Sequence, residues 1–473
     1  MSDIKKKYNV VIVGAGPTGI FTALELIEKE ADCEILILEK GNDISSRSCP
    51  MKEKPGSGEG CYECVSCAVV SGWGGAGAYS DGKLSLSSDI GGNLEEYIGE
   101  ENLESLISYA DDIYVKFGAP DKIFGVSEKK AEEFRDKAAR AGLKFIPAHL
   151  RHLGTGYSKK VLKEMRDYLL DQGVEIRFNT RVTDIIVEES ENKVEGVRLE
   201  SGEKVEADFV TVAPGRENAS WLAQEIDKLN LNTSLNPIDI GVRVETSASI
   251  ARPLTEELYE SKLIYHTPTF DDKVRTFCVC PNGEVVSENN QGLITVNGHT
   301  HSDMETENAN FALLVSKTFT EPFKEPHTYG QAIAKLANLL GAGVLVQRLG
   351  DLLAGRRSTE ARIKRSIVDP TLKQATAGDL SLVFPHRHLT GIKEMLEALD
   401  ELAPGIYSKD TLLYGVEAKF YSSRLEVSPG LETKVENLFA GGDGAGITRG
   451  LMQASVAGLI IGQEIIKRNG SDT

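Results

Sequence analysis

Four cysteines lie close together in the N-terminal part of the chain. Cys49, Cys61, Cys64 and Cys67 form a C-x11-C-x2-C-x2-C set. Four thiolates suit a 4Fe–4S cluster, which can act as a one-electron relay, and the same number suits tetrahedral zinc. A third alternative leaves the four thiols without metal, two of them forming a redox-active pair. The spacing therefore predicts a metal or thiol site with three alternatives open.

The other three cysteines follow strand-like patterns. Cys33 lies on a predicted buried strand, and Cys278 and Cys280 share one face of another. We expect these three to be core or strand residues and not metal ligands. An odd total of seven cysteines, without an export signal after Lys5-Lys6-Lys7, favours a reducing compartment, so we expect a cytoplasmic protein.

A glycine-rich turn of the G-x-G-x-x-G type follows a predicted buried strand at residues 8–13 and opens a helix. The turn consists of Gly14, Ala15, Gly16, Pro17, Thr18 and Gly19. Gly14 permits a tight turn, Gly16 lets the backbone approach a pyrophosphate, and Gly19 lets helix and strand pack closely. Glu39, followed by Lys40, ends the next predicted strand, where it would accept hydrogen bonds from a ribose. The unit predicts a dinucleotide site and leaves NAD and FAD open.

Further segments of the chain are typical of the domain that such a turn belongs to. We expect a helix at 159–172, a strand at 174–179, a hairpin at 182–188 and 193–199, a strand at 208–212, a return at 437–440 and a final helix at 451–468. Residues 47–88 read as a long ordered loop, and residues 95–142 as charged helices interrupted near Pro120. These elements would position the turn and the cysteines.

Composition and charge exclude some classes of partner. The chain has 473 residues and a formal net charge of -18, which opposes binding to phosphate backbones, so we expect no nucleic-acid partner. The longest C-terminal apolar stretch, 457–461, is far too short to cross a bilayer, so we expect no membrane partner. The length favours two or three substructures.

Two later segments distinguish FAD from NAD through a resemblance. Residues 208–216, which contain Ala213 and Gly215, and residues 438–443, which contain Gly442 and Asp443, resemble motifs of the FAD enzymes related to glutathione reductase and p-hydroxybenzoate hydroxylase. The resemblance implies that the first segment lies beside the cofactor and that the Asp443 carboxylate binds the ribityl chain. It also implies that the backbone of Val182 touches adenine.

A closer resemblance spans nearly the whole chain. Residues 72–84, 151–156, 239–245 and 308–310 are similar to the uncharacterised family known as FAD-dependent dehydrogenases. That family has other residues at Gly156 and within 442–450. We expect the glycines of 72–84, Gly74 and Gly75 among them, to pass against the pyrophosphate and isoalloxazine, with Ser80 or Lys83 donating to the cofactor.

Candidates for acid–base work come from the same segments. They are His152, Arg243, His299 and His301, and no spacing rule selects among them. Arg243 lies on an apolar-patterned strand, where a buried cation could stabilise negative charge on reduced flavin or on a carboxylate substrate. Each of them could instead be a structural hydrogen-bonding residue.

The expected fold class is α/β, with a Rossmann-like FAD-binding domain and an inserted α+β substrate domain. We expect the first domain at 1–220 and 430–473, with the loop 47–88 and a helical cover at 95–142, and the second at 221–429. We find no second G-x-G-x-x-G set between a strand and a helix, so NAD(P)H is expected only as a transient electron donor.

The predicted function is that of an FAD-dependent oxidoreductase that exchanges hydride between flavin and a small organic substrate. One alternative is an electron-transfer flavoprotein that uses a cysteine-ligated cluster or a redox partner protein. A second is a flavin-dependent nucleic-acid-modifying enzyme, which the acidity disfavours, and a third is a non-enzymatic flavin-binding regulator.

Overall fold

A computed structural model describes residues 6–49, 66–80, 82–188, 190–255, 262–290, 292–300, 305–320, 323, 326–419 and 423–470. The chain divides into two compact units. Unit 1 comprises Met1–Ile123, Leu150–Ser234 and Ser422–Thr473, and unit 2 comprises Phe124–His149 and Leu235–Tyr421. Each unit has a hydrophobic core of its own.

Unit 1 combines one main sheet with long helices. Its helices are α1 (Pro17–Glu28), α3 (Glu95–Ile98), α4 (Glu100–Lys116), α6 (Thr155–Asp171), α7 (Ala219–Lys228) and α13 (Leu451–Asn469), with short 3-10 turns η1 (Gly75–Tyr79), η2 (Arg216–Asn218) and η4 (Asp443–Ala445). Its strands are β1 (Lys7–Val13), β2 (Ile35–Leu38), β3 (Lys83–Ser85), β6 (Leu150–His152), β7 (Glu175–Arg177), β8 (Val182–Glu188), β9 (Lys193–Leu199), β10 (Lys204–Val212), β11 (Thr233–Ser234), β21 (Arg424–Leu425) and β22 (Leu438–Ala440); β4 (Ile123–Phe124) lies at the boundary of the units.

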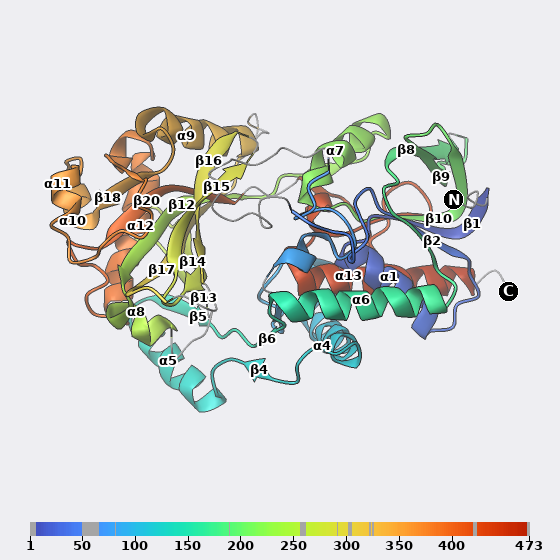
Figure 1. Ribbon diagram of the computed structural model, residues 1–473, viewed down its shortest axis with the longest axis horizontal. Coiled ribbons are helices and arrows are strands. Elements are labelled where there is room, and N and C mark those ends of the chain that lie inside the picture. The colour runs from blue at the N-terminus through green and yellow to red at the C-terminus, as the bar shows by residue number, and fades with distance from the viewer. Residues whose placement is uncertain are drawn as a thin grey trace. The chain divides into compact units, whose positions relative to one another are not determined.

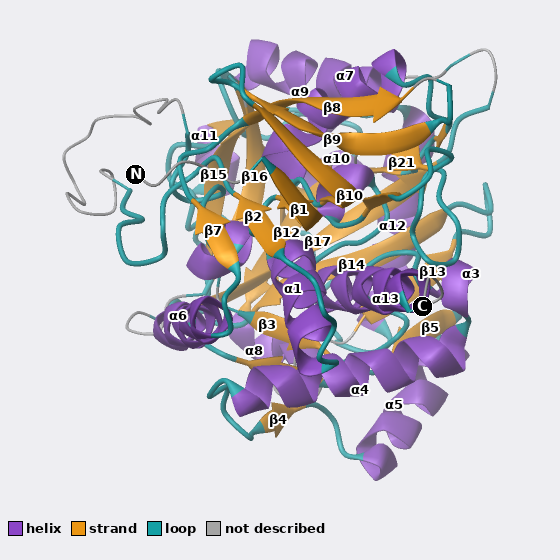
Figure 2. Ribbon diagram, turned by 90° about the vertical axis from the view of Figure 1, so that its right-hand side faces the viewer, coloured by secondary structure: helices purple, strands orange, loops and turns teal. Residues whose placement is uncertain are grey.

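The main sheet of unit 1 has the order β7-β2-β1-β10-β9-β8, and β22 pairs with β10. Strands β7, β2, β1, β10 and β22 are parallel to their neighbours, whereas β8, β9 and the first part of β10 form an antiparallel meander (Figure 2). Because the central parallel strands are covered on both faces, residues 10–13 of β1 and all of β2 are continuous apolar runs. This is a Rossmann-like sheet.

Helices α1 and α13 lie side by side below this sheet (Figure 1). Small residues allow their close approach: a Cβ on Gly458 would lie 2.3 Å from the carbonyl oxygen of Thr18. The Thr18 hydroxyl donates to the carbonyl of Ala454 at 2.8 Å. The C-terminal helix thus fixes the position of the helix that follows the glycine-rich turn.

Unit 2 is built around a larger, mostly antiparallel sheet. Its helices are α5 (Glu128–Arg140), α8 (Ala248–Thr255), α9 (Pro326–Gly341), α10 (Leu349–Leu353), α11 (Glu360–Ile363) and α12 (His386–Asp400), with the 3-10 turn η3 (Leu380–Leu382). Its strands are β5 (Leu143–Ile146), β12 (Ile238–Ser247), β13 (Lys262–His266), β14 (Lys273–Cys280), β15 (Glu284–Asn290), β16 (Leu293–His299), β17 (Asn308–Lys317), β18 (Leu345–Arg348), β19 (Thr376–Ala377) and β20 (Leu412–Lys419).

The eight-stranded sheet of unit 2 has the order β19-β18-β20-β12-β17-β14-β13-β5, and β15 and β16 form a separate hairpin. Only β18 and β19 pair in parallel. Strands β12 and β17 are almost entirely buried at the centre of the sheet, and α12 packs on β12, β14 and β17. Alternation alone would not reveal such strands, because both of their faces are covered.

The predicted fold class, α/β with a Rossmann-like sheet and a second α+β part, is confirmed. The predicted helix that follows the glycine-rich turn, the hairpin and the final helix correspond to α1, β8–β9 and α13. The predicted helical cover at 95–142 is divided: α4 packs on α13 in unit 1, whereas α5 packs on β5 in unit 2. No helix among the described residues is long and apolar enough to span a membrane.

Candidate functional site

The glycine-rich turn joins β1 to α1 with contacts that explain two of its glycines. Gly14 has a φ of +107°, and a Cβ there would lie 2.5 Å from the carbonyl oxygen of Ala213. A Cβ on Gly19 would lie 2.0 Å from the carbonyl oxygen of Gly14. Both glycines are therefore required by the fold itself, because no larger side chain fits.

Gly16 differs from these two glycines. A Cβ on Gly16 would meet no protein atom within 4 Å, so the packing of the protein gives no reason for a glycine at this position. Gly16 is the N-cap of α1, no side chain caps this helix, and Pro17 occupies the first turn. An uncapped helix N-terminus presents unbonded N–H groups and the positive end of the helix dipole. The open space and these donors fit an anionic diphosphate.

Glu39 organises the backbone around this turn. Its carboxylate accepts hydrogen bonds from the backbone N–H groups of Ala15 at 2.9 Å, Gly41 at 2.8 Å and Gly72 at 2.9 Å. The residue is only 6% exposed. The three bonds join the glycine-rich turn, the end of β2 and the loop that contains Gly72 at one carboxylate.

The segment 66–80 lies against the glycine-rich turn. The N–H of Gly74 donates to the carbonyl of Ala15 at 2.7 Å. Gly74 has a φ of +83°, and a Cβ there would lie 2.4 Å from Leu162. A Cβ on Gly75 would lie 3.4 Å from the Cα of Gly16. Gly74 and Gly75 therefore lie against the glycine-rich turn, and their contact with a cofactor stays a prediction.

Arg47 holds this segment in place, and the sequence analysis missed it. Its guanidinium donates to the carbonyls of Trp73 at 2.6 Å and Gly75 at 2.8 Å, and to those of Ala68 and Val69. Arg47 is 4% exposed, and burial lowers its pKa. The Tyr79 hydroxyl donates back to the Arg47 carbonyl at 2.7 Å. In the sequence, only the absence of a regular helix or strand pattern in this segment, with an arginine nearby, could have indicated this role.

The other loop candidates have local partners. The Ser80 hydroxyl donates to the carbonyl of Gly77 at 2.9 Å and accepts from the N–H of Gly82 at 3.1 Å, so it closes a turn. Lys83 and His152 are opposite each other on the antiparallel strands β3 and β6. The structure thus brings these two predicted site residues together in unit 1.

The loop that follows β10 in unit 1 lies against the glycine-rich turn. The strands β10 and β22 run parallel, and the loops that follow them contain Ala213 and Gly215 on one side and Gly442 and Asp443 on the other. The N–H of Gly444 donates to the carbonyl of Pro214 at 3.0 Å. The two segments that resemble flavoenzyme motifs therefore lie side by side.

Asp443 begins η4, close to the N-terminus of α13. Its carboxylate accepts from the Thr448 hydroxyl at 3.1 Å and from the N–H of Gly450 at 3.4 Å, and it lies 3.8 Å from the Arg216 Nε. Burial raises the pKa of Asp443, and the Arg216 charge opposes that rise. The carboxyl group keeps acceptor capacity for a ligand hydroxyl.

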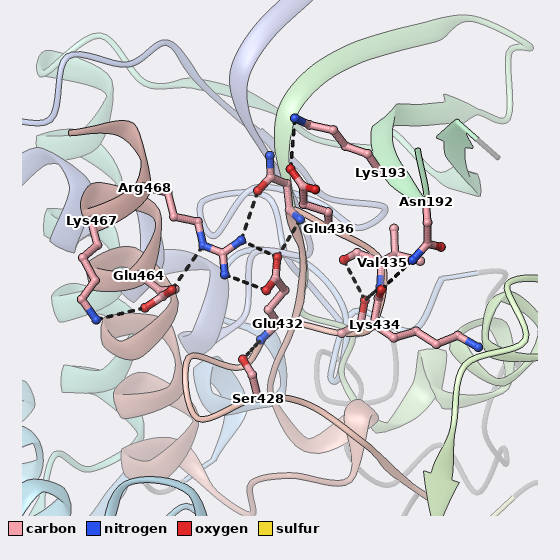
Figure 3. A network of polar contacts seen from close by, with 12 residues as sticks. Asn192, Lys193, Ser428, Glu432, Lys434, Val435, Glu436, Glu464, Lys467 and Arg468 are labelled. Atoms are coloured by element: carbon pink, nitrogen blue, oxygen red, sulfur yellow. Dashed lines mark hydrogen bonds and ion pairs between the residues drawn. The ribbon is translucent and has the colours of Figure 1, made fainter. Parts of the chain in front are cut away.

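An ionic network at the other end of α13 fixes the approach to β22 (Figure 3). Arg468 donates to both oxygens of Glu432, at 2.5 and 2.6 Å, and to Glu464 at 3.2 Å. The backbone N–H of Asn437 also donates to the Glu432 carboxylate, at 2.8 Å. Bidentate arginine–carboxylate pairs have a defined geometry, so this pair positions the strand that leads to Asp443.

Lys40 and Val182 complete the predicted cofactor set. Lys40 donates to the Asn218 side chain at 2.8 Å and forms an ion pair with Glu217 at 3.0 Å. Val182 is 6% exposed at the start of β8. Their roles toward a cofactor stay predictions.

Arg243 and His299 lie in unit 2. The Arg243 side chain is fully buried on β12, where its Nε donates to Asn310 at 2.7 Å and its Nη2 to the Cys278 carbonyl at 2.8 Å. His299 is exposed at the end of β16. His301 lies outside the described residues. The structure does not bring Arg243 and His152 into one unit.

Glu245, two residues after Arg243 on the same strand, is a buried carboxylate with several donors. It accepts from the Tyr414 hydroxyl at 2.5 Å, the Thr371 hydroxyl at 2.6 Å and the Asn308 amide at 3.0 Å. Burial raises its pKa despite these bonds. The strand was predicted from the sequence, whereas a role for this carboxylate was not.

The raised pKa of Glu245 makes a testable prediction about stability. An acid whose pKa is higher in the folded state gains stability as the pH falls through that pKa. We therefore expect the free energy of unfolding of the wild type, relative to Glu245→Gln, to rise between pH 7 and pH 5. Denaturant unfolding at three pH values measures it, and parallel pH profiles for the two proteins would contradict it.

The four-cysteine site cannot be assembled from the described residues. Cys49 and Cys67 are described, whereas Cys61 and Cys64 lie outside the described residues. Within the described ranges, no group of three or more His, Cys, Asp or Glu side chains could hold a metal ion. The metal therefore stays a prediction from the spacing.

Elemental analysis tests that prediction directly. If the cysteines bind metal, anaerobically purified protein contains stoichiometric iron with acid-labile sulfide, or stoichiometric zinc, and Cys64→Ser lowers that content. Absence of iron, sulfide and zinc, with unchanged stability and flavin content in Cys64→Ser, would show that the four cysteines do not form a metal site.

Two family matches cover the centre of the chain. Residues 237–420 match the family described as FAD-dependent protein, C-terminal domain-like. Residues 129–249 match the pyridine nucleotide-disulphide oxidoreductase family. The second match includes β8, β9, β10 and the turn with Ala213 and Gly215. On these matches the chain is an FAD-dependent oxidoreductase, and that sequence-based prediction is confirmed.

Similarity to three whole proteins extends over nearly the full chain. An uncharacterized protein of Clostridium beijerinckii is 26% identical over 489 residues, which cover 98% of this chain and 81% of that protein. Glycine oxidase from Geobacillus kaustophilus is 13% identical, with a TM-score of 0.38 and coverage of 98% and 95% of the two chains. The 3-ketosteroid-delta4-(5alpha)-dehydrogenase from Rhodococcus jostii RHA1 is 13% identical, with a TM-score of 0.45 and coverage of 98% of both chains.

Proposed function

We propose that unit 1 binds FAD non-covalently and that the flavin exchanges hydride with a small organic substrate. The observation that carries the proposal is the open space beside Gly16 at the uncapped N-terminus of α1. A diphosphate placed there would accept hydrogen bonds from the backbone N–H groups of the first helical turn. The FAD-dependent family match supports FAD as the dinucleotide.

Residues around the turn supply the remaining contacts in this proposal. Glu39 would accept hydrogen bonds from the adenosine ribose in addition to the backbone donors that it already holds. The backbone of Val182 would contact adenine. Asp443 would accept from the ribityl hydroxyls, with Thr448 and Gly450 orienting its carboxylate. The segment Gly72–Tyr79, held by Arg47, would exclude water from the diphosphate.

When bound, FAD would supply the two-electron chemistry, and the protein residues would bind and orient it. Lys83 and His152, paired across β3 and β6, are the proposed proton-handling residues of unit 1. We propose no separate NAD(P)H-binding domain. A nicotinamide donor would therefore bind only transiently.

Anaerobic reduction of the bound flavin tests the proposed activity. Amino acids, hydroxy acids, steroids, NADH and NADPH are offered separately, and the flavin absorbance is followed. An organic substrate that bleaches the flavin stoichiometrically supports the oxidoreductase. Reduction only by a protein electron donor would favour an electron-transfer flavoprotein, and a flavin that no donor reduces would favour a regulator.

A further inference from the structure

Unit 2 contains a buried cluster of two cysteines, an arginine and a carboxylate. Arg243 on β12 donates from Nη2 to the Sγ of Cys280 at 3.1 Å. Arg243 and the neighbouring Glu417 on β20 are completely buried, and Cys280 on β14 is 4% exposed. Glycine at position 298 makes room for the guanidinium, because a Cβ there would lie 1.8 Å from Arg243 Nη2.

The charges of this cluster do not balance without the thiol. Glu417 forms ion pairs with both Arg243, at 3.5 Å, and Lys419, at 3.1 Å. The nearest further cation along β14, Arg275, has its own carboxylate in Asp239 at 2.6 Å. Among the residues that the structure describes, these two cations thus share a single carboxylate. Because buried charges are normally paired, a negative charge on the Cys280 sulfur would complete the cluster.

Asn310 is the neutral side chain that borders this cluster on β17. Its side chain is fully buried, and it lies opposite Cys280 in the pairing of β14 with β17. The Oδ1 atom accepts from Arg243, whereas the Nδ2 group has no hydrogen-bond acceptor among the described residues. An unsatisfied buried N–H donor is costly.

Cys278 stands next to Cys280 in a strained conformation. Its φ is +44°, which a residue other than glycine rarely adopts, and the register of β14 shifts between Phe277 and Cys280. The two sulfurs are 4.0 Å apart. A disulfide bond needs about 2.05 Å, so the side chains have to move closer for the bond to form. Strain of this kind is a feature of functional sites.

We propose that Cys278 and Cys280 form a redox-active dithiol that reduces small-molecule disulfides, with Arg243 as the residue that stabilises the Cys280 thiolate. Cys278 is partly exposed and is the thiol that a reagent reaches. Both cysteines lie on β14, as expected from the sequence. The local charge and geometry point to a role beyond packing.

The exchange balances as two successive displacements. Cys278 Sγ attacks one sulfur of a disulfide RSSR while its proton passes to the Cys280 thiolate, and one RS⁻ leaves. Cys280 returns that proton to the departing RS⁻, and its Sγ then attacks Cys278 Sγ. The Cys278–Cys280 bond forms, and the second RS⁻ leaves and takes a proton from solvent. The two cysteines are oxidised by two electrons, and RSSR is reduced to two RSH.

Peptide-resolved alkylation tests the thiolate. Native protein is treated with iodoacetamide between pH 5 and 10, and modification of each cysteine is followed by mass spectrometry. We expect a midpoint for Cys280 below about 7.5, against about 8.5 for an ordinary thiol. Cys33 is the internal control, because burial raises its pKa to about 11. Denatured protein gives the ordinary midpoint for all three cysteines.

The variant Asn310→Asp tests the charge argument at constant size. The new carboxylate would lie beside Arg243 and compensate the surplus positive charge. We expect the alkylation midpoint of the pair to rise by at least one pH unit, with Cys33 unchanged. An unchanged midpoint in this variant, or a wild-type midpoint at or above 8.5, would overturn the proposed thiolate.

Oxidation tests the dithiol. Incubation of the full-length protein with oxidised glutathione should yield a peptide with a Cys278–Cys280 disulfide, which dithiothreitol reverses. In Cys280→Ser the reaction should stop at a mixed disulfide on Cys278. If the wild type forms no such disulfide, or retains only a mixed disulfide, the two cysteines do not act as a pair. A folded state is verified for each variant by circular dichroism.

Discussion

Replacement of Gly16 by valine is expected to abolish flavin binding while the fold of unit 1 persists. The valine side chain would meet no protein atom near its Cβ, so it should not disturb β1 or α1. It would instead occupy the space that the proposed diphosphate needs. We expect FAD affinity to fall at least about a hundred-fold, which corresponds to about 2.7 kcal/mol. Titration of apoprotein with FAD, followed by flavin fluorescence, measures the loss.

Two further glycine variants serve as controls. Gly16→Ala should weaken FAD binding less than Gly16→Val, because its side chain is smaller. Gly19→Ala should destabilise the protein even without flavin, because its Cβ would lie 2.0 Å from the Gly14 carbonyl oxygen. Full FAD binding by Gly16→Val, with an unchanged melting temperature, would place the cofactor away from this turn.

Replacement of Arg47 by methionine is expected to destabilise the segment 66–80 and to weaken flavin binding as a consequence. The change removes the donors to the carbonyls of Ala68, Val69, Trp73 and Gly75, some of which are buried. Hydrogen bonds to charged groups contribute about 1.5–3 kcal/mol each, so a loss of at least about 3 kcal/mol is expected. Thermal unfolding and limited proteolysis of residues 66–80 measure it.

Arg181→Met is the matched control for this change. The Arg181 side chain is 55% exposed and lies 3.8 Å from that of Glu200, which is 67% exposed, so its loss should change stability by no more than about 0.5 kcal/mol. If Arg47→Met unfolds at the same temperature as Arg181→Met and binds FAD normally, the segment does not depend on Arg47.

Local patterns in the sequence were sufficient to predict the nucleotide-binding half of the fold. The turn Gly14–Gly19 was predicted from glycine spacing between a strand and a helix, and the hairpin 182–199 from two apolar runs around a polar turn. Both depend on neighbouring residues and on backbone geometry alone. The fold class followed from them.

Long-range contacts could not be predicted in this way. Arg47 was not singled out because its acceptors are backbone carbonyls 21 to 28 residues further along the chain, and such carbonyls carry no sequence signal. Residues 128–140 have the same charged helical pattern as 100–116, yet α5 packs on β5 in unit 2. A helical pattern shows which face is apolar but not which sheet covers it.

The environment of Arg243 in unit 2 was likewise predictable only in part. Its apolar strand correctly suggested a buried cation, whereas its partners Asn310 and Glu417 come from strands far apart in the sequence. The position of Arg243 next to Cys280 could not be predicted either, because the antiparallel pairing of β12 with β17 and of β17 with β14 creates it.

The cofactor released from the purified protein tests the central claim most directly. Protein is purified under mild conditions, denatured by heat, and the supernatant is analysed by chromatography with a flavin detector. The proposed function predicts non-covalent FAD at about one molecule per chain, with Gly16→Val lacking it. Release of FMN, or no flavin even after reconstitution of folded wild-type protein with FAD, would contradict the claim.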